Sequence, residues 1–486
     1  MELNETTIKH FRLAEGAYIY FIGIGGSSMS GLAELSKGNG YCVAGSDRAK
    51  SAATEKLETL GIKVNIGHDA RNITCDLGLV VYTIAISPDN PEYLRAEELG
   101  IPTIERGLFL SYIASEFAAT LAVCGVHGKT TTTTMLAAVL GAAGLEPSVH
   151  VGGVIPGINS NVIVGGNSLF VTEACEYHDN FLKLSPTYGI MLNVEPEHLD
   201  YFGTIERMQQ SFAKFAAKIP EYGLLAVCSD SPAALDCAKH AVCDIITFSL
   251  TQNNPPEAFV NTKGKRPLHH YSAADCSLEN GAELLEGFSA EVLCDGEKAM
   301  NLRLHIPGLH NVSNALSVIA VARHLGADYN LIARGFDTFR GAKRRFEHVG
   351  DTAGGAHIIS DYAHHPSEIK AVLAAAAGKA AGKIIAVFQP HTYSRAAAFR
   401  KLFPEALRDA DLVIITDIYA AREKDPGTIS AQLLKDDISA AGISCEYLKT
   451  FDEISAKVLE LAKKDDLIML LGAGTVNLIA DMIVNR

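Results

Sequence analysis

The sequence lacks the features that mark secreted and membrane-spanning proteins. None of its ten cysteines forms a C-x-x-C pair, so we expect reduced thiols that are mostly buried in apolar strands, as at Cys42, Cys124 and Cys228. No apolar run approaches the length of a membrane-spanning helix, and residues 1–12 contain no apolar segment of a signal peptide. We therefore expect a soluble, cytoplasmic protein.

Positive charge is also scarce. Lys and Arg total 42 against 56 Asp and Glu, which gives a formal net charge of −14. Because nucleic acid and anionic membranes both attract basic surfaces, we expect neither as a partner. The chain is nevertheless rich in hydrophobic residues, at 48% against 20% charged residues, which is enough for several buried cores. Its length of 486 residues predicts about three domains.

The most informative segment is 125–132, which reads Gly-Val-His-Gly-Lys-Thr-Thr-Thr. It lies between an apolar run at 121–124 and a helical pattern that begins at Thr132. A strand, a glycine-rich turn and a helix in this order form a cradle for a nucleoside triphosphate. Lys129 then reaches the terminal phosphates, and the Thr130 hydroxyl can hold Mg²⁺.

A second glycine-rich turn lies near the N-terminus. An apolar run ends at Gly23-Ile-Gly-Gly26, and a helix-compatible stretch at 27–37 and a strand at 41–47 follow. Asp47 lies near the spacing, roughly 20 residues, at which a dinucleotide-binding fold places a carboxylate on a ribose. Ser28 replaces the third glycine of G-x-G-x-x-G, which disfavours nicotinamide but leaves a pyrophosphate site at the helix N-terminus. A tight turn without a ligand remains the alternative.

Apolar strands and helical stretches alternate along the chain. This alternation predicts an α/β fold with three domains: Rossmann-like at 1–117, phosphate-loop ATPase-like with a mostly parallel sheet at 118–341, and Rossmann-like at 342–486. Residues 251–300 are polar and punctuated by Gly and Pro, which predicts inserted or appended antiparallel hairpins. The other expected elements are strands at 79–83, 101–104, 168–172, 188–193, 224–228, 358–361, 384–389, 412–417 and 467–471, and helices at 205–217, after 307 and at 371–381.

Polar side chains follow two of the expected central strands. Glu173 comes directly after one strand, and Asn193 and His198 follow the next. The carboxyl ends of parallel strands meet at the edge of the sheet where α/β proteins bind ligands, so these side chains should converge. Glu173 is then a candidate for binding Mg²⁺ or positioning a water molecule.

Two more polar segments, 361–368 and 389–395, follow strands in the last third of the chain. The adjacent histidines of the first segment point apart on most backbones, and no cysteine or H-x-x-x-H spacing accompanies them. We therefore favour substrate or nucleotide binding there over zinc. The arginines in this part of the chain that can form forked contacts with phosphate or carboxylate are Arg344, Arg345 and Arg395.

Taken together, these motifs resemble those of the ATP-dependent Mur ligases of bacterial cell-wall synthesis, in particular the branch that adds L-alanine. Val126 stands where the family usually has Thr, and Cys175 where it often has Asp. Other branches carry a carbamylated lysine near the position of Lys214, but the alanine-adding branch generally lacks it, so Lys214 receives no role. The resembling segments, in the family's order, are Gly23–Gly31, Gly45–Asp47, Gly125–Thr132, Glu173–Tyr177, Asn193–His198, His310–Asn314, Arg344–Phe346, Asp361–Pro366 and Gln389–Arg395.

The resemblance implies a reaction and its ligands. ATP and Mg²⁺ would activate the lactyl carboxylate of UDP-N-acetylmuramate as an acyl phosphate, and the amine of L-alanine would then attack it. The first domain would bind the UDP-sugar and the second ATP, while the third would close over ATP and the amino acid. The protein would act as a monomer or homodimer.

The resemblance also implies roles for individual residues. Catalytic roles would fall to Lys129, Glu173, His198, His364 and Arg395, and metal binding to Thr130, Glu173 and His198. The ATP site would comprise Gly125, His127, Gly128, Lys129, Thr130, Thr131, Asn314, Arg345 and Asp361. The substrate site would comprise Gly23, Gly25, Gly26, Ser27, Ser28, Met29, Ser46, Asp47, Ser87, Arg106, Asn193 and His365.

Three other functions remain open from the sequence. The first is the recycling ligase, which joins UDP-N-acetylmuramate to a preformed tripeptide and shares both glycine loops. The second is a nicotinamide-dependent oxidoreductase, which Ser28 and the second nucleotide loop disfavour. The third is a nucleotide-switch binding protein without ligase activity, which substrate-dependent ATP turnover would exclude.

Overall fold

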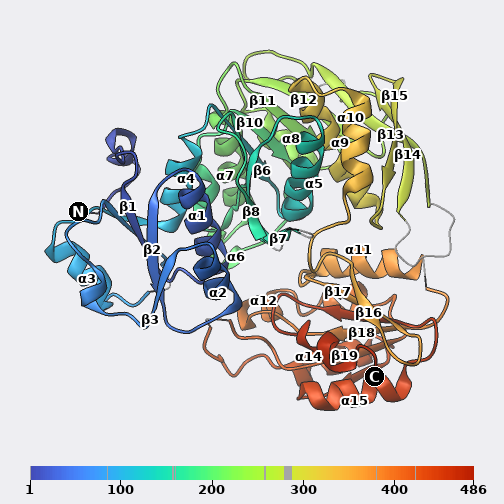
Figure 1. Ribbon diagram of the computed structural model, residues 1–486. Helices are drawn as coiled ribbons and strands as arrows, with labels where there is room; N and C mark the ends of the chain where they lie inside the picture. Colours follow the sequence, from blue (N-terminus) through green and yellow to red (C-terminus); the bar gives the residue numbers. More distant parts are fainter. Residues whose placement is uncertain are drawn as a thin grey trace. The chain divides into compact units, whose positions relative to one another are not determined.

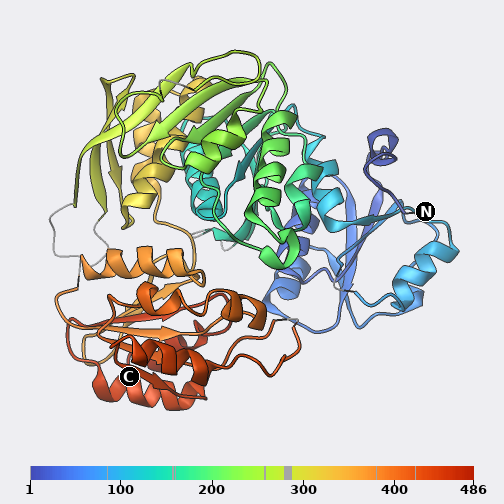
Figure 2. The same cartoon turned by 180° about the vertical axis from the view of Figure 1, so that it is seen from behind.

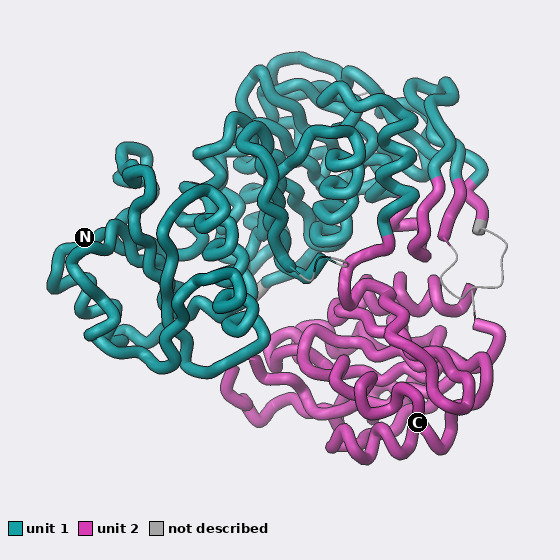
Figure 3. The backbone as a smooth tube through the Cα atoms, viewed as in Figure 1, with its two compact units in different colours: residues 1–275, 290–302, 313–339 teal, residues 276–289, 303–312, 340–486 magenta. Residues whose placement is uncertain are grey.

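The computed structural model describes residues 2–84, 86–155, 158, 160–256, 259–278, 287–378, 380–421 and 423–486. The chain packs into two compact units (Figure 3). Unit 1 comprises residues 1–275, 290–302 and 313–339, and unit 2 comprises residues 276–289, 303–312 and 340–486.

Unit 1 begins with a five-stranded parallel sheet of order β3-β2-β1-β4-β5 (Figure 1). Side chains alternate across it, so that Ile19 and Phe21 join the core on one face and Tyr20 and Ile22 the core on the other. The strand order reverses beside β1, which is the switch point where such sheets bind ligands. Its strands are β1 (Tyr18–Ile22), β2 (Cys42–Asp47), β3 (Lys63–Ile66), β4 (Leu79–Tyr82) and β5 (Thr103–Glu105).

Helices cover both faces of this first sheet. Helices α1, α2 and α4 contribute to one core, and the segment from η2 to α3 contributes to the other. The cap of α3 is local: the Asn90 side chain accepts hydrogen bonds from the first-turn amides, and Pro91 starts the helix. The bounds are η1 (Ile8–His10), α1 (Ser27–Gly38), α2 (Ala52–Thr59), η2 (Ala70–Asn72), α3 (Pro91–Glu98) and α4 (Arg106–Ala114).

The second sheet has ten strands in the order β15-β14-β13-β12-β11-β10-β6-β9-β7-β8. The strands from β13 to β7 in this order pair in parallel, and β8 runs antiparallel to β7. They are β6 (Ala119–Cys124), β7 (Ser148–Ile155), β8 (Ser160–Ile163), β9 (Leu169–Glu173), β10 (Tyr188–Met191), β11 (Leu224–Cys228), β12 (Asp244–Ser249), β13 (His269–Leu278), β14 (Phe288–Cys294) and β15 (Glu297–Leu304).

Helices also flank this second sheet. Helices α7 and α8 pack side by side and share a core with β6, β10 and β11 (green in Figure 2). Helix α5 packs against α10 and against β7 and β9. The bounds are α5 (Lys129–Ala142), η3 (Tyr177–Lys183), α6 (Leu199–Phe202), α7 (Ile205–Lys218), α8 (Pro232–Ala238), α9 (Leu309–His324) and α10 (Tyr329–Thr338).

Unit 2 contains a six-stranded sheet of order β16-β17-β21-β18-β19-β20, parallel except for the edge strand β16. Helices α11 to α14 share a core with one face, and α15 and α16 with the other. The strands are β16 (Glu347–Asp351), β17 (His357–Asp361), β18 (Ile384–Phe388), β19 (Leu412–Ile415), β20 (Cys445–Tyr447) and β21 (Leu467–Leu471). The helices are α11 (Pro366–Ala377), α12 (Tyr393–Ala398), α13 (Phe403–Ala406), α14 (Ala431–Ala440), α15 (Phe451–Leu461) and α16 (Leu478–Ile483).

The expected α/β class with three largely parallel sheets is confirmed, whereas the domain boundaries at 117 and 341 stay a prediction. The hairpins expected within 251–300 are only partly present. Strand β13 joins β12 in parallel, because the long connection after β12 returns the chain to the same end of the sheet. Strands β14 and β15 do form a hairpin, since Asp295 and Gly296 between them have φ of 53° and 85°, as a two-residue turn requires.

Three smaller expectations are wrong. Helix α5 begins at Lys129 rather than Thr132, because the left-handed Gly128 is its N-cap. The alanine-rich helix α11 begins earlier than expected, at Pro366, where His365 caps it. All ten cysteines are free thiols, but only four are buried. Cys42, the first residue of β2, is exposed.

Candidate active site

The phosphate loop, residues 125–128, connects β6 to α5. Gly125 and Gly128 have φ of 139° and 85°, in the region that favours glycine. A Cβ on Gly128 would lie 2.9 Å from Oδ1 of Asn314, and one on Gly125 would lie 3.0 Å from the Cβ of Leu192. The loop therefore has no room for side chains at either glycine. Asn314 lies beside the loop, and its role in the nucleotide site stays a prediction.

Asn193 braces this loop. Its Oδ1 accepts a hydrogen bond from the backbone N–H of His127 at 2.9 Å, and its Nδ2 donates to the His127 carbonyl at 3.1 Å. The Asn193 carbonyl also accepts from the N–H of Val126 at 3.3 Å. Asn193, predicted to bind substrate, thus holds the loop on three bonds, and its substrate role stays a prediction.

Lys129 is held by a buried carboxylate that the sequence did not single out. Its Nζ lies 2.9 Å from Oε2 of Glu176, and it also donates to the carbonyls of Val126 and Gly125. Burial alone would lower the pKa of Lys129, but the Glu176 carboxylate raises it above its usual value. The lysine therefore remains an ammonium ion, as a residue that binds phosphate must be.

Glu176 also reaches His198. The Glu176 side chain is 1% exposed, and its Oε1 lies 3.6 Å from Nε2 of His198. His198 has a φ of 52° and packs against the ring of Tyr177, with ring centroids 4.4 Å apart. One carboxylate therefore brings together Lys129 and His198, which the sequence predicted separately. The only sequence signal for Glu176 is its place in the segment that follows β9.

Thr130 and Glu173, two predicted metal ligands, each lie near one of two successive glycines of β7. Oε1 of Glu173 accepts a hydrogen bond from the N–H of Gly152 at 2.8 Å. A Cβ on the neighbouring Gly153 would lie 3.1 Å from Cγ2 of Thr130. A hydroxyl and a carboxylate are the hard oxygen donors that Mg²⁺ prefers, so the chemistry of the two side chains suits that ion, and their role as its ligands stays a prediction. The metal role of His198 and the ATP role of Thr131, which is 7% exposed in α5, stay predictions.

The N-terminal glycine loop is closed by Asp47. Its Oδ2 accepts a hydrogen bond from the N–H of Gly25 at 2.8 Å. A Cβ on Gly25 would lie 2.9 Å from that same oxygen and 2.9 Å from Cγ2 of Thr54. Gly23 turns the chain with a φ of 82°, and Gly26 is the N-cap of α1. The loop thus presents backbone, as a pyrophosphate site at a helix N-terminus needs.

Ser28, Arg106 and His150 meet beside this loop. The Ser28 hydroxyl lies 3.3 Å from Nε2 of His150 and accepts a hydrogen bond from Nη1 of Arg106 at 3.4 Å. Burial, with the nearby Arg106 charge, lowers the pKa of His150 to about 4. His150 belongs to β7, far from Ser28 in sequence, and the sequence did not predict it. The imidazole is therefore neutral at physiological pH.

The structure places the other predicted substrate residues in different settings. The Ser27 hydroxyl donates to the carbonyl of Gly152 at 3.3 Å. Met29 is 3% exposed in α1, and Ser46 is fully buried, where it donates to Glu92. Ser87 is exposed and donates to Asp89. None of these contacts tests the predicted binding roles, which stay predictions.

Unit 2 gathers polar groups at the carboxyl end of β17. Asp361 is 3% exposed and accepts hydrogen bonds from the N–H groups of Phe346 at 2.6 Å and Ala363 at 2.7 Å. Burial raises the pKa of Asp361 to about 6, although Arg345 opposes the shift. Arg345 lies 5.3 Å over the ring of Tyr362. Asp361 thus fastens the segment that carries Arg345.

The histidines of this segment point to different partners, as expected. Nδ1 of His364 lies 3.4 Å from Oε2 of Glu368, and its ring centroid lies 5.6 Å from that of His391. His391 in turn lies 3.0 Å from Nη1 of Arg395. His365 is 6% exposed and caps α11. The structure thus links His364 to Arg395 through His391. His365 has a structural contact as the cap of α11, and its predicted role in substrate binding stays a prediction.

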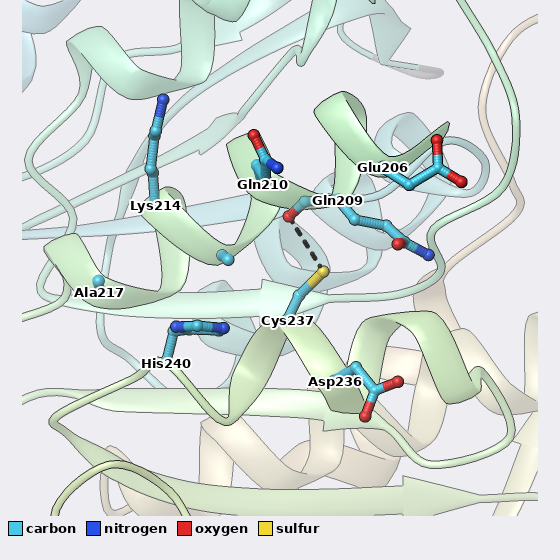
Figure 4. A pocket seen from close by; sticks show the side chains of 9 residues that line it. Glu206, Gln209, Gln210, Lys214, Ala217, Asp236, Cys237 and His240 are labelled. Atoms are coloured by element: carbon cyan, nitrogen blue, oxygen red, sulfur yellow. Dashed lines mark hydrogen bonds between the residues drawn. The ribbon is translucent and has the colours of Figure 1, made fainter. Parts of the chain in front are cut away.

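Lys214 lies on the exposed side of α7, in an open groove of about 610 Å³ between α7 and α8 (Figure 4). The groove is lined by Glu206, Gln209, Gln210, Ala213, Lys214, Ala217, Asp236, Cys237 and His240. Its floor is tied together by the Cys237 thiol, which donates to the carbonyl of Gln209 at 3.3 Å.

Within the described part of the chain, no helix combines the length and the apolar character that a bilayer crossing requires.

Comparison with protein families and known proteins agrees with this geometry. Residues 18–118 match the Mur ligase family, catalytic domain, residues 123–322 the Mur ligase middle domain, and residues 344–474 the Mur ligase, glutamate ligase domain. These matches favour the ligase over the oxidoreductase.

Similar curated proteins include the UDP-N-acetylmuramate--L-alanine ligase of Acetivibrio thermocellus, which is 42% identical over 96% of this chain and 95% of its own length. The enzyme of the same name from Clostridium novyi is 40% identical over 96% of both chains. Among solved structures, the UDP-N-acetylmuramate-alanine ligase of Thermotoga maritima has a TM-score of 0.77 and 28% identity, covering 96% of this chain and 98% of its own. A murein peptide ligase from Psychrobacter arcticus has a TM-score of 0.66 and 25% identity, with the same coverage. The chain belongs to the Mur ligase family.

Proposed function

We propose that the protein uses ATP to join L-alanine to the lactyl carboxylate of UDP-N-acetylmuramate, in the synthesis of peptidoglycan precursors. The observation that carries the proposal is the buried carboxylate of Glu176, which holds Lys129 as a charged group at the phosphate loop and also reaches His198. The L-alanine-adding relatives, which align with 96% of the chain, support this choice of substrates.

The reaction proceeds in two steps because a carboxylate is a poor electrophile. A lactyl carboxylate oxygen attacks the γ-phosphorus of ATP, and the bond from that phosphorus to the bridging oxygen breaks. ADP leaves, and the substrate becomes an acyl phosphate. The uncharged amine of L-alanine then attacks the acyl carbon, the bond to the phosphate oxygen breaks, and the nitrogen loses a proton. The products are an amide, ADP and phosphate.

The residues at the phosphate loop would counter the charge of the transferring group. Lys129 places a fixed positive charge beside the loop, where it costs no reorganisation during the reaction. We propose that Thr130 and Glu173 would be ligands of one Mg²⁺ and that His198 would be a ligand of a second Mg²⁺. When bound, Mg²⁺ would neutralise charge on the phosphoryl oxygens. Asn314 and the loop backbone of His127 would complete the nucleotide site.

The N-terminal loop would hold the UDP-sugar. Its backbone turns at Gly23, approaches Asp47 at Gly25 and leads into α1, whose first amides face a pyrophosphate in folds of this kind. Ser28 and Arg106, already in contact, add a hydroxyl and a guanidinium group. We propose that three residues of unit 2, Arg345, His364 and Arg395, contact the nucleotide and the amino acid.

A phosphate-release assay tests this function. The protein is incubated with ATP, Mg²⁺ and UDP-N-acetylmuramate, and each amino acid or the L-alanyl-γ-D-glutamyl-meso-diaminopimelate tripeptide is added in turn. We expect phosphate release with L-alanine and a product whose mass equals UDP-N-acetylmuramate plus one alanyl residue. Release with the tripeptide alone would show the recycling ligase instead, and no substrate-dependent release would refute ligation altogether.

A further inference from the structure

A cluster of two histidines and an aspartate lies on the edge of the unit 2 sheet, among residues to which the proposed ligation gives no role. Oδ1 of Asp351 lies 2.9 Å from Nε2 of His348 and 2.7 Å from Nδ1 of His357. The two imidazole rings have centroids 5.8 Å apart and planes inclined by 66°. Three potential metal ligands therefore converge, within 4.8 Å of one another.

An irregularity in strand pairing creates this convergence. His348 and Asp351 are three residues apart on β16, so in a regular strand they would point to opposite faces. The register of β16 against β17 shifts between His348 and Gly350, where an additional residue interrupts the pairing. After this β-bulge, Asp351 lies directly opposite His357, while His348 lies opposite Ile359. Because His357 and Ile359 are two residues apart, all three ligand side chains share one face.

The exposure of the cluster suits an ion that arrives from solvent. The side chains of His348 and His357 are 27% and 25% exposed, and that of Asp351 is 49% exposed. The imidazoles are therefore held mainly by their surroundings, while the carboxylate leaves an open side. Such an opening would allow water molecules to complete the coordination of a metal.

We propose that His348, Asp351 and His357 bind a divalent transition-metal ion, such as Zn²⁺, which fastens the edge strand β16 to β17. Two imidazole nitrogens and one carboxylate oxygen are a common ligand set for such ions, at about 2.0–2.2 Å from the metal. A tetrahedral site of this size needs ligand atoms roughly 3.3 Å apart. The two contacts to Asp351 would have to open by about 0.5 Å, and the two imidazole nitrogens lie within 4.8 Å of each other. Each imidazole would turn a lone pair to the metal, and the hydrogen bonds to Asp351 would be replaced by metal bonds.

The described residues contain one other group of three such ligands, in unit 1. It consists of His269, Cys294 and Asp295, and Sγ of Cys294 lies 3.8 Å from the carboxylate. The His269 and Asp295 side chains are 52% and 49% exposed. Its imidazole is thus more exposed than those of the β16–β17 cluster. The thiol gives this second group a distinct spectroscopic signature and makes it a natural control.

Titration of the full-length protein with Co²⁺ and Zn²⁺, without nucleotide and with excess Mg²⁺, tests the proposal. Imidazole sites discriminate against Mg²⁺, so Mg²⁺ should not compete. We expect a Co²⁺ complex with visible d–d absorption and without the near-ultraviolet band of a thiolate ligand. His348→Gln and His357→Gln should each weaken binding at least about tenfold, since the loss of even an outer contact to a metal ligand costs that much. His269→Gln, the matched control, should leave binding unchanged.

A second measurement covers the case in which a histidine variant folds poorly. Zn²⁺ should slow hydrogen–deuterium exchange in β16 and β17 of the unmodified protein, and Asp351→Asn, which keeps the side-chain shape, should abolish this slowing. Unchanged affinity in both histidine variants, a thiolate band, or exchange in β16 that does not respond to Zn²⁺ would overturn the proposal.

Discussion

The ammonium group of Lys129 lies 2.9 Å from a carboxylate oxygen of Glu176, whose side chain is 1% exposed. The pair connects the first residue of α5, which follows β6, to the segment that follows β9. Strand β9 comes three strands after β6 in the sequence but lies next to it in the sheet. Glu176 faces His198 with its other oxygen. A change in either partner therefore affects charge at the phosphate loop.

Lys129→Ala should abolish most ligase activity. Removal of a fixed charge from a transferring phosphoryl group costs on the order of 3 kcal/mol or more, about a hundredfold in kcat. The measurement is the initial rate of phosphate release. The variant also leaves Glu176 buried without its partner, so unfolding must be measured in parallel. Glu176→Gln is the matched control: it should keep Lys129 in place by hydrogen bonding and lose less activity. Near-normal turnover in Lys129→Ala would rule out its assigned role.

Glu173→Ala should raise the Mg²⁺ concentration needed for half-maximal activity, because its carboxylate supplies a hard oxygen ligand in the proposed Mg²⁺ site. His198→Ala should do the same or lower turnover sharply. The rate of phosphate release as a function of Mg²⁺ concentration measures both. Glu206→Ala is a suitable control, since that exposed carboxylate lies on α7, in the groove that also holds Lys214. The metal roles are wrong if both variants keep the wild-type Mg²⁺ dependence.

Gly25→Val should weaken binding of UDP-N-acetylmuramate much more than binding of an ATP analogue. The reason is steric rather than conformational, because Gly25 is absent from the residues with positive φ. Its new Cβ would collide with Asp47 and Thr54 and displace the glycine loop. Calorimetric titration of both ligands measures the difference. Gly141→Val, where a side chain meets open space, controls for the added bulk. Equal losses for both ligands in a folded Gly25 variant would argue against separate sites.

Asp361 should make unit 2 less stable as pH rises from about 4 to about 6. Its pKa in the folded protein is about 6 against an ordinary 3.8, because burial disfavours the charged form. Between pH 4 and pH 6 the folded state thus binds more protons than the unfolded state. Above pH 6, where Asp361 is ionised in both states, the free energy of unfolding is lower by on the order of 3 kcal/mol. Asp361→Asn removes this dependence. We expect the free energy of unfolding of wild type, relative to this variant, to fall between pH 4 and pH 7. A constant difference would contradict the shifted pKa.

Local sequence patterns predicted the features that depend on residues close together in the chain, namely the phosphate loop and the fold class. The strand, the glycine turn and Lys129 form one continuous segment, and the alternation of apolar strands gave the fold class. Contacts between distant segments could not be predicted in this way. His150 reaches Ser28 from another sheet, and Glu176 is buried although the preceding Cys175 is exposed.

Strand direction and pairing register could also not be predicted from the sequence. Strand β13 runs parallel to β12 because of the path of a long polar connection, which carries no periodic signal. The bulge in β16 depends on how that strand pairs with β17, so the alignment of His348 with Asp351 appears only in the folded sheet. The polar composition of 251–300 correctly indicated the hairpin at Asp295 and Gly296. It did not indicate that β13 pairs in parallel with β12.

The three hydrogen bonds between Asn193 and residues 126–127 have a thermodynamic consequence. They fix the loop in the absence of nucleotide, so its conformational entropy is lost when the protein folds and not when ATP binds. Nucleotide association should then proceed with little loop rearrangement. Asn193→Ala would return that freedom to the loop, and the affinity for ATP would fall through an unfavourable binding entropy even though no direct contact with the phosphates had been removed.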